Sequence, residues 1–415
     1  MNVPNTLKFT GKDSSIVGSS KARLLFAIYE KLKINQKLRG KIKQEFSGQM
    51  PGIFVGSFGY PVVNTGFLSS EENAGLNNPL MWSKKGASKY GLLDIIKIRS
   101  ELVNSNFSVN VKSFNKRLKD ELKDTSLSIK PVDADINLIE KPSFRLNVSR
   151  DLLPIGPSAP LKKLSITVNP KIPRFVDKIE SDTDLKAVLG VNSLFNKGFD
   201  EHYITKIFSG GNLGVKTERK LVPTKWSITA VDDTLGKNII SNNLKDFKEH
   251  DYAAFFGGYM GNYYLALIIP GPWSYELFET YVGKGLSNPS SYESASDYEN
   301  PFGRKSYAQN TVGGYYAARL AVLEYFKKNK RVGRVLMLRF ITDEYWAPLG
   351  VWVVREASRN SFKSTPLIFE SIEYMLKYAN LLTMKKYNLN LDVIFKKSQL
   401  LFALKNQKTL SKYIN

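Results

Sequence analysis

Three carboxylates in the second half of the chain are the residues best suited to chemistry. Asp297 and Glu299 stand two positions apart in a polar stretch before a helical segment, and Asp232 follows a stretch that contains a tryptophan. Two or more acids around a divalent ion can activate water and stabilise a leaving oxygen. Oxygen ligands suit Mg²⁺ or Mn²⁺, so one hypothesis is a metal-dependent DNA nuclease. The alternative is that these acids cap helices and turns.

The basic balance of the chain and its clusters of basic and aromatic residues predict DNA binding. The chain has 60 basic and 38 acidic residues and a net charge of +22. This balance favours a polyanionic partner such as DNA, although a generally lysine-rich protein would also show it. Cations would contact phosphates, and an aromatic ring would stack on a base. The predicted DNA-binding residues are Lys225, Trp226, Arg304, Lys305, Arg319, Lys327, Lys328, Lys330 and Arg331. The alternative places Trp226 in the core and the lysines on a solvated helix end.

The last nine residues have the pattern of a peptide that binds a sliding clamp. Gln407, Leu410 and Tyr413 follow one another at intervals of three, and Ile414 extends the apolar side. One short helical turn would place Leu410 and Tyr413 on the same side. A flexible tail of this kind would order on docking. The alternative is an ordinary amphipathic end.

The scarcity of cysteine and histidine excludes several kinds of site. The chain has no cysteine and two histidines, 202 and 250. Disulfides and cysteine-based zinc or iron–sulfur sites are therefore excluded, and no zinc site is expected. No cofactor is certain, and Mg²⁺ or Mn²⁺ would be needed only by a nuclease. No apolar run resembles a signal peptide or a membrane span. We therefore expect a cytoplasmic protein with no membrane partner.

The elements that must position these residues predict an α+β fold. We expect mixed sheets with helices, a helical C-terminal region and a flexible C-terminal tail. Hydrophobic periodicity predicts helices at 92–103, 112–123, 183–197, 200–209, 310–326 and within 367–404. Strands are predicted at 53–55, 62–63, 335–341 and 351–355, as two short strands within 129–146, and as a hairpin at 252–269. Five prolines predict an extended segment without long regular elements at 151–173. The predicted regions are a basic helical lead-in (1–50), an N-terminal region (51–205), a C-terminal region (206–404) and a tail (405–415).

Several segments of the chain, in the same order, resemble the archaeal Nre DNA repair family. They include VGSFGYPVVNTG (55–66), SDTDLKA (181–187), the tryptophan-containing block at 221–233, PGPWS (270–274), GGYYAAR (313–319) and PLGVW (348–352). The resemblance implies a role in repair of DNA damage and docking on the archaeal sliding clamp. The family's clamp-binding motif would fall on Gln407, Leu410 and Tyr413, with Ile414 as a departure. Many members also begin with a cysteine-rich zinc-binding segment, which this chain lacks.

Overall fold

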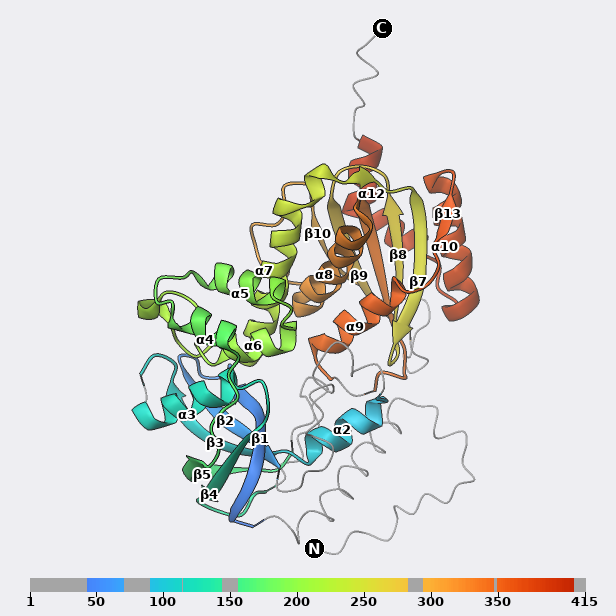
Figure 1. The fold of residues 1–415 in the computed structure, drawn as a ribbon. Helices are drawn as coiled ribbons and strands as arrows, with labels where there is room; N and C mark the ends of the chain where they lie inside the picture. Colours follow the sequence, from blue (N-terminus) through green and yellow to red (C-terminus); the bar gives the residue numbers. More distant parts are fainter. Residues whose placement is uncertain are drawn as a thin grey trace, which may run out of the picture.

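The computed structural model describes residues 43–406 except 71–89, 114, 144–155, 283–293 and 347–348. It shows a small barrel, a group of helices beside it, and a larger sheet with helices on both faces (Figure 1). These mixed sheets and helices confirm the predicted α+β class. Within the described ranges, no helix is both long and apolar enough to cross a bilayer.

Five strands form the closed barrel, which is blue and teal in Figure 1. The strands are β1 (Glu45–Val55), β2 (Val62–Ser70), β3 (Val103–Asn110), β4 (Val132–Leu138) and β5 (Ser158–Ile166). They are hydrogen-bonded in the order β1-β2-β3-β5-β4, and β4 also pairs with β1. Neighbouring strands are antiparallel except β3 and β5, which are parallel. Helix α3 (Lys116–Leu127) connects β3 to β4.

Strand β1 pairs with both β2 and β4 and so closes the barrel, because it is irregular at its middle. Residues 45–50 pair with β4 and residues 49–55 pair with β2, with a register shift between Gln49 and Gly52. A side chain at Gly48 would place its Cβ 2.6 Å from the carbonyl oxygen of Ser70, so the close approach of β1 and β2 requires glycine there. Residues 45–50, at the end of the predicted helical lead-in (1–50), form the first half of β1.

The barrel interior follows the period of two that strands impose. In β4, alternate residues Val132, Ala134, Ile136 and Leu138 are all buried. They pack in one apolar cluster with residues of the other strands and with Leu122 of α3, which is 1% exposed. The barrel therefore has a core of its own.

The proline-rich segment is more regular than the sequence predicted. The prediction of no long regular element at 151–173 is wrong, because β5 covers nine residues of it and includes Pro160. Pro160 stands where the parallel pairing with β3 ends and next to a register shift in the pairing with β4. A residue that cannot donate to the ladder is tolerated at such a position. Within 129–146 the described part shows one strand, β4, and not two.

Four helices lie between the barrel and the large sheet (Figure 1). They are α4 (Arg174–Ser181), α5 (Ala187–Asn196), α6 (Glu201–Ser209) and α7 (Thr224–Asn242). A short 3₁₀ helix, η4 (Lys216–Glu218), precedes α7, and another, η5 (Leu244–Asp246), follows it. The predicted helices at 183–197 and 200–209 correspond to α5 and α6. Helix α7 was not predicted, because its buried positions include serine, threonine, aspartate and glycine and give no clear apolar stripe.

The large sheet has six strands in the order β10-β9-β12-β8-β7-β13. They are β7 (Tyr252–Tyr259), β8 (Asn262–Ile269), β9 (Ser274–Tyr281), β10 (Ser294–Glu299), β12 (Arg334–Ile341) and β13 (Leu367–Phe369). A separate pair consists of β6 (Lys248–Glu249) and β11 (Arg331–Val332). The β7–β8 hairpin is confirmed, and its turn residues Met260 and Gly261 both have positive φ, as a tight hairpin requires.

Helices cover both faces of this sheet. Helices α8 (Val312–Asn329) and α9 (Val351–Ser361) pack on the face toward α7, and α10 (Ile372–Tyr387), α11 (Asp392–Lys397) and α12 (Gln399–Asn406) pack on the other. Helix α2 (Leu92–Ser100) contacts the start of α9. The strand predicted at 351–355 is wrong. Its run of β-branched residues lies in α9, where buried Val353, Val354 and Ala357 have helical spacing.

Candidate nucleic-acid interface

Trp226 lies at the surface where α7 meets the barrel. Its side chain is 43% exposed, and its ring centroid lies 5.1 Å from that of Tyr60 in the β1–β2 loop. The Nζ atom of Lys220 lies 5.9 Å from the centroid of the Tyr60 ring. Phe58 in the same loop is 97% exposed. We call Phe58, Tyr60, Lys220, Lys225 and Trp226 the rim cluster.

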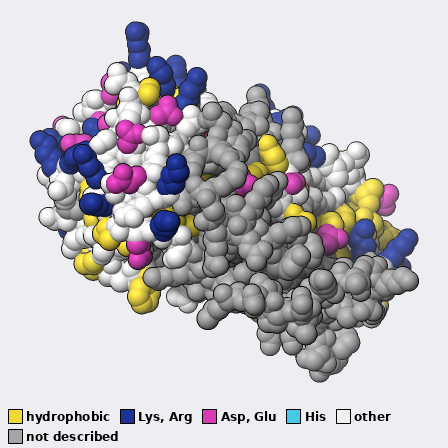
Figure 2. Space-filling view, turned by 90° about the horizontal axis from the view of Figure 1, so that it is seen from below, with side chains coloured by type: hydrophobic (Ala, Val, Ile, Leu, Met, Phe, Trp, Pro, Cys, Tyr) yellow, Lys and Arg dark blue, Asp and Glu magenta, His cyan; other side chains and the backbone are white. Residues whose placement is uncertain are grey.

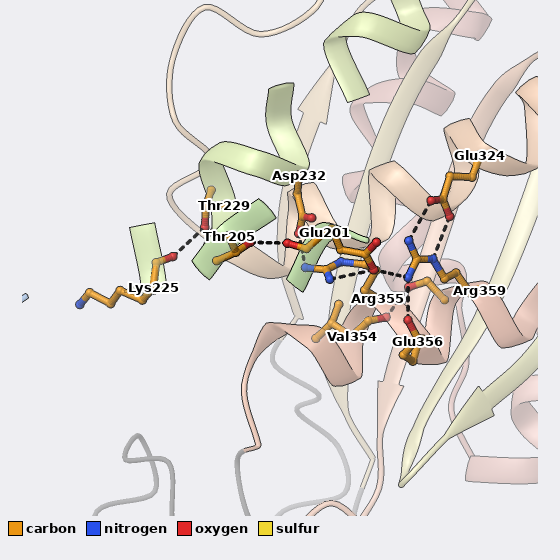
Figure 3. A network of polar contacts seen from close by, with 11 residues as sticks. Glu201, Thr205, Lys225, Thr229, Asp232, Glu324, Val354, Arg355, Glu356 and Arg359 are labelled. Atoms are coloured by element: carbon orange, nitrogen blue, oxygen red, sulfur yellow. Dashed lines mark hydrogen bonds and ion pairs between the residues drawn. The ribbon is translucent and has the colours of Figure 1, made fainter. Parts of the chain in front are cut away.

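The start of α7 is fixed to the barrel by hydrogen bonds. The backbone N–H of Val55 donates to Thr224 Oγ1 at 3.0 Å, and the N–H of Leu221 donates to the carbonyl oxygen of Val111 at 3.0 Å. Trp226 is therefore held at the surface, and the alternative that it packs in the core is wrong. Lys225 is exposed and points away from the interior polar network drawn in Figure 3.

Sequence reasoning missed Phe58, Tyr60 and Lys220. The available signal was the pair of aromatic residues in a turn punctuated by Gly56, Gly59 and Pro61. Large aromatic residues in a short loop between two strands have little core to fill. Such loops often carry binding residues on a rigid scaffold.

The outer face of β2 and β3 next to the rim cluster is polar and uncharged. Asn64 faces Ser108 across the two strands, and Val62 faces Asn110. All four residues are exposed. Neither strand contains an acidic or basic residue. This face offers amides and a hydroxyl without a carboxylate that would repel a phosphate.

A second group of candidate residues lies at the end of α8. Lys327, Lys328 and Lys330 are exposed, and Lys330 ends the helix in a left-handed conformation. Arg331 donates through Nη1 to the carbonyl oxygen of Glu249 at 3.0 Å. In the parallel pairing of β11 with β6, Arg331 lies opposite Lys248. We call Lys327, Lys328, Lys330, Arg331 and Lys248 the α8 patch. Cations at this position also compensate the negative end of the helix dipole.

Arg304 and Lys305 belong to the loop between β10 and α8. The Arg304 guanidinium donates to the carbonyl oxygens of Tyr298, Ser306 and Tyr307 and lies 3.1 Å from the Asp297 carboxylate. These contacts hold the loop around a polar hollow of about 300 Å³. Lys305 is exposed. Arg304 thus organises the loop, and Lys305 is the cation that the loop presents to solvent.

Asp297 and Glu299 both lie on β10 but have different partners. Asp297 Oδ2 accepts hydrogen bonds from the backbone N–H groups of Asn310 and Thr311 and from the Thr311 hydroxyl. Glu299 accepts from Trp273 Nε1 and from Arg319 Nη1, each at 2.8 Å. The first arrangement fixes the approach to α8, and the second is a buried ion pair.

Arg319 was predicted to contact DNA, but the structure places its side chain inside the protein, 1% exposed. Its guanidinium bridges Glu299 and Asp233. Burial works against its charge, but these two carboxylates raise the pKa of Arg319 above its usual value. Arg319 therefore joins β10 to α7 as a permanent cation.

Asp232 belongs to another buried network, which joins α6, α7, α8 and α9 (Figure 3). Arg355 donates to Asp232 at 3.0 Å and to Glu201 at 3.2 Å. Arg359 donates to Glu201 and Glu356 at 2.6 Å each. We call this set the arginine network; its members are Glu201, Asp232, Glu324, Arg355, Glu356 and Arg359.

The two innermost acids of the arginine network have opposite pKa shifts. Burial raises the pKa of Asp232 to about 6, although Arg355 opposes the shift. Burial also works against ionisation of Glu201, but Arg359 and Arg355 together hold its pKa well below the usual range. The difference follows from the contacts, because Glu201 lies between two guanidinium groups and Asp232 has only Arg355.

The three predicted catalytic acids are therefore each paired with a different arginine. Asp232 lies in the arginine network, Glu299 pairs with Arg319, and Asp297 pairs with Arg304. Across the described ranges, no three His, Cys, Asp or Glu side chains are grouped so as to hold a metal ion. The nuclease hypothesis stays a prediction; incubation of nicked, branched and single-stranded DNA with Mg²⁺ or Mn²⁺ would test it.

The face of the molecule drawn in Figure 2 carries charged side chains of both signs. Figure 2 shows Lys and Arg side chains at both ends of one face, with Asp and Glu side chains interspersed.

The predicted clamp-binding residues Gln407, Leu410, Tyr413 and Ile414 lie outside the described residues. They follow α12, which ends at Asn406.

Comparison with known proteins identifies relatives over most of the chain. The family described as archaeal Nre, N-terminal, matches residues 22–288, and archaeal Nre, C-terminal, matches residues 299–413. DNA repair protein NreA of Archaeoglobus fulgidus is 33% identical over 376 residues, which cover 89% of this chain and 92% of the relative. DNA repair protein NreA of Haloferax volcanii is 35% identical over 331 residues, covering 77% and 78%. DNA repair protein NreB of A. fulgidus is 33% identical over 361 residues, covering 84% and 87%. No solved structure matches significantly.

Proposed function

Because the chain belongs to the archaeal Nre family, we propose that it is a DNA repair protein that binds DNA and docks on the archaeal sliding clamp. The repair role is supported by the relatives named DNA repair protein. The two binding activities are supported by features of this chain.

The α8 patch is the observation that best supports DNA binding. Its three exposed lysines lie within four residues of one another, with Arg331 and Lys248 beside them. A compact group of cations neutralises several adjacent phosphates and releases their counterions. Such contacts give affinity without sequence preference. We therefore expect the α8 patch to bind the DNA backbone.

Salt dependence and charge reversal test this binding. The logarithm of the affinity should fall linearly with the logarithm of the salt concentration, by roughly 0.7–0.9 per phosphate neutralised. Replacing Lys327, Lys328 and Lys330 by Glu should weaken binding to all sequences alike. The matched control replaces Lys385, Lys396 and Lys397, exposed lysines of α10 and α11, by Glu with the same change in net charge. Equal losses for the two triple variants would exclude the α8 patch as the contact site.

Clamp docking is supported by the pattern at 407–414, which directly follows a well-anchored helix. The carboxylate of Glu276 accepts hydrogen bonds from the N–H groups of Gln399 and Leu400, at 2.9 and 3.0 Å, and fixes the start of α12. A peptide that begins after α12 would thus be attached to a rigid base. Leu410 and Tyr413 are expected to fill an apolar pocket of the clamp.

Binding of purified clamp, measured by calorimetry, tests the docking element. Replacing Leu410 and Tyr413 by Ala should cost about 2 kcal/mol or more for each buried anchor. The control replaces Thr409 and Ser411, at intervening positions, by Ala. Deletion of residues 407–415 should abolish binding and leave the melting temperature unchanged. Unchanged clamp affinity after the deletion would refute the peptide as the docking element.

A further inference from the structure

The topology of the barrel indicates a nucleic-acid-binding scaffold. The order β1-β2-β3-β5-β4, a β1 strand shared between β2 and β4, and a helix between β3 and β4 are the features of an OB-fold. OB-folds use the face of β2 and β3 and the loop between β1 and β2 to bind oligonucleotides. Fold alone does not establish a site, so the residues at this place must carry the argument.

The residues at this place are exposed aromatic side chains. Phe58 and Tyr60 lie in the β1–β2 loop, and Trp226 lies against Tyr60 from α7. Phe58 is almost fully exposed, so it makes no contribution to the core. Aromatic rings in a barrel loop provide faces on which unpaired bases stack. Bases in a duplex are already stacked on one another, so these rings favour a single strand.

The surroundings of the rings suit the rest of a nucleotide. Lys220 lies over the Tyr60 ring, and Lys225 is exposed beside Trp226. The adjoining outer face of β2 and β3 presents Asn64, Ser108 and Asn110. The hydrogen bond from the Val111 N–H to the carbonyl oxygen of Pro61, at 3.0 Å, joins the end of β3 to the loop. The rings and the polar face therefore form one continuous surface, with cations for phosphates and amides for base edges.

We propose that this surface binds single-stranded DNA. Bases stack on Phe58 and on the Tyr60–Trp226 pair, and Lys220 and Lys225 contact the phosphates. The choice of DNA rests on the proposed function. The surface is distinct from the α8 patch, so it adds to that function a preference for unpaired segments such as those exposed at damaged sites.

The test compares a fluorescent oligo-dT with a blunt duplex of the same length, by anisotropy at constant salt. Replacing both Phe58 and Trp226 by Ala should weaken oligo-dT binding about tenfold or more and leave duplex binding unchanged. A loss of this size is consistent with one or two lost stacking contacts. The matched control replaces Tyr374 and Phe402, exposed aromatics of α10 and α12, by Ala. A third variant, Trp226→Phe combined with Phe58→Tyr, keeps both rings and should retain binding. Melting temperatures verify that the variants fold.

The outcomes separate this inference from the proposed function. If the Phe58→Ala, Trp226→Ala variant binds oligo-dT as well as the control while charge reversal of the α8 patch abolishes binding, the inference is overturned and DNA binding stands. If the unmodified protein binds neither oligonucleotide at low salt, both are overturned. Tighter binding of oligo-U that depends on the same two rings would overturn the assignment to DNA.

Discussion

At the scale of the residue, the arginine network shows how buried charge is arranged in this protein. Arg359 contacts Glu324 through two hydrogen bonds at 2.8 Å, and its remaining nitrogen contacts Glu201 and Glu356. Each guanidinium thus serves more than one carboxylate. A buried charge is tolerated only when it is paired in this way. Removal of one partner leaves the opposite charge buried without compensation for its lost hydration, which destabilises the fold.

Replacing Arg355 by Met should lower the free energy of unfolding by about 3–5 kcal/mol, because Asp232 loses its partner and Glu201 loses one of two. Urea denaturation at pH 7 measures the change. The control is Lys237→Met, which removes an ion pair to Asp233 from a lysine whose side chain is 59% exposed. That variant should lose less than about 1 kcal/mol. Similar losses in the two variants would contradict the structural role of Arg355.

The raised pKa of Asp232 predicts a pH dependence of stability. The pKa of Asp232 is 3.8 in the unfolded chain and about 6 in the folded protein. Between these two pH values the folded protein binds the Asp232 proton more tightly than the unfolded chain does. The stability that this residue contributes is therefore present below pH 3.8 and lost as the pH rises through 6. Compared with Asp232→Asn, the native protein should lose about 2 kcal/mol of unfolding free energy between pH 4 and 7. Denaturation curves across this range check it, and parallel pH profiles would contradict it.

At the scale of the element, α12 depends on a residue from the sheet. Glu276 of β9 is fully buried. Its carboxylate accepts hydrogen bonds from the first two N–H groups of the helix and from the Ser398 hydroxyl. A helix of eight residues has little stability of its own. Its start is instead held by a negative charge at the positive end of its dipole.

Replacing Glu276 by Ala should therefore cost about 2–3 kcal/mol, because hydrogen bonds to a charged group are lost inside the protein. Hydrogen exchange should become faster in residues 399–406 before it changes elsewhere. The control is Glu370→Ala, an exposed carboxylate before α10, which should leave stability and hydrogen exchange almost unchanged. Uniformly faster exchange over the whole sheet would show that α12 is not a separate unit.

Sequence patterns predicted those elements whose hydrophobic period, composition or turn residues match the structure that they adopt. The β7–β8 hairpin, β12, and helices α5 and α6 have clear periods or turn residues, and α8 is a mostly apolar segment too long for a strand. Helix α7 could not be predicted because serine, threonine, aspartate and glycine occupy buried positions where a helix normally carries apolar residues. The start of α9 could not be predicted because its β-branched residues are typical of a strand. The partners of Asp232 and Glu299 lie 123 and 20 residues away, and no short-range pattern reports such contacts. The barrel also went unrecognised, because its strand order depends on pairing between distant segments.

At the scale of the whole molecule, the protein has two main bodies with separate cores. The apolar cluster of the barrel and the cluster between the helices and the large sheet share no residue. Polar contacts connect them through α6. Lys206 Nζ donates to the carbonyl oxygen of Ser128 at 2.6 Å, and Asn212 donates to Ser126 Oγ at 2.7 Å. Apolar contacts add to these hydrogen bonds, because Leu127 of α3 packs in the cluster of the large sheet and Leu221, just before α7, packs in the cluster of the barrel.

The double variant Lys206→Met, Asn212→Ala should weaken the coupling between the two bodies. We expect scanning calorimetry to show two transitions in place of one, because each core can then unfold independently. Burial lowers the pKa of Lys206 to about 8, so methionine at this position removes a charge that is costly to bury. The control is Lys197→Met, an exposed lysine of the same helical group. A single transition at a lower temperature would show that the bodies unfold together.

The shared acceptors of the arginine network also constrain how the sequence can change over generations. A substitution at Arg359 removes an ion pair from Glu201, Glu324 and Glu356 at once, so we expect it to cost more stability than a substitution at Asp232. Asp232 is the member of the network that can be substituted first. Its raised pKa means that its neutral form is only slightly disfavoured, and Asn resembles that neutral form. We expect divergent descendants to exchange Asp232 first and Arg355 next, and to retain Glu201, Arg359 and Glu324 as one inherited set.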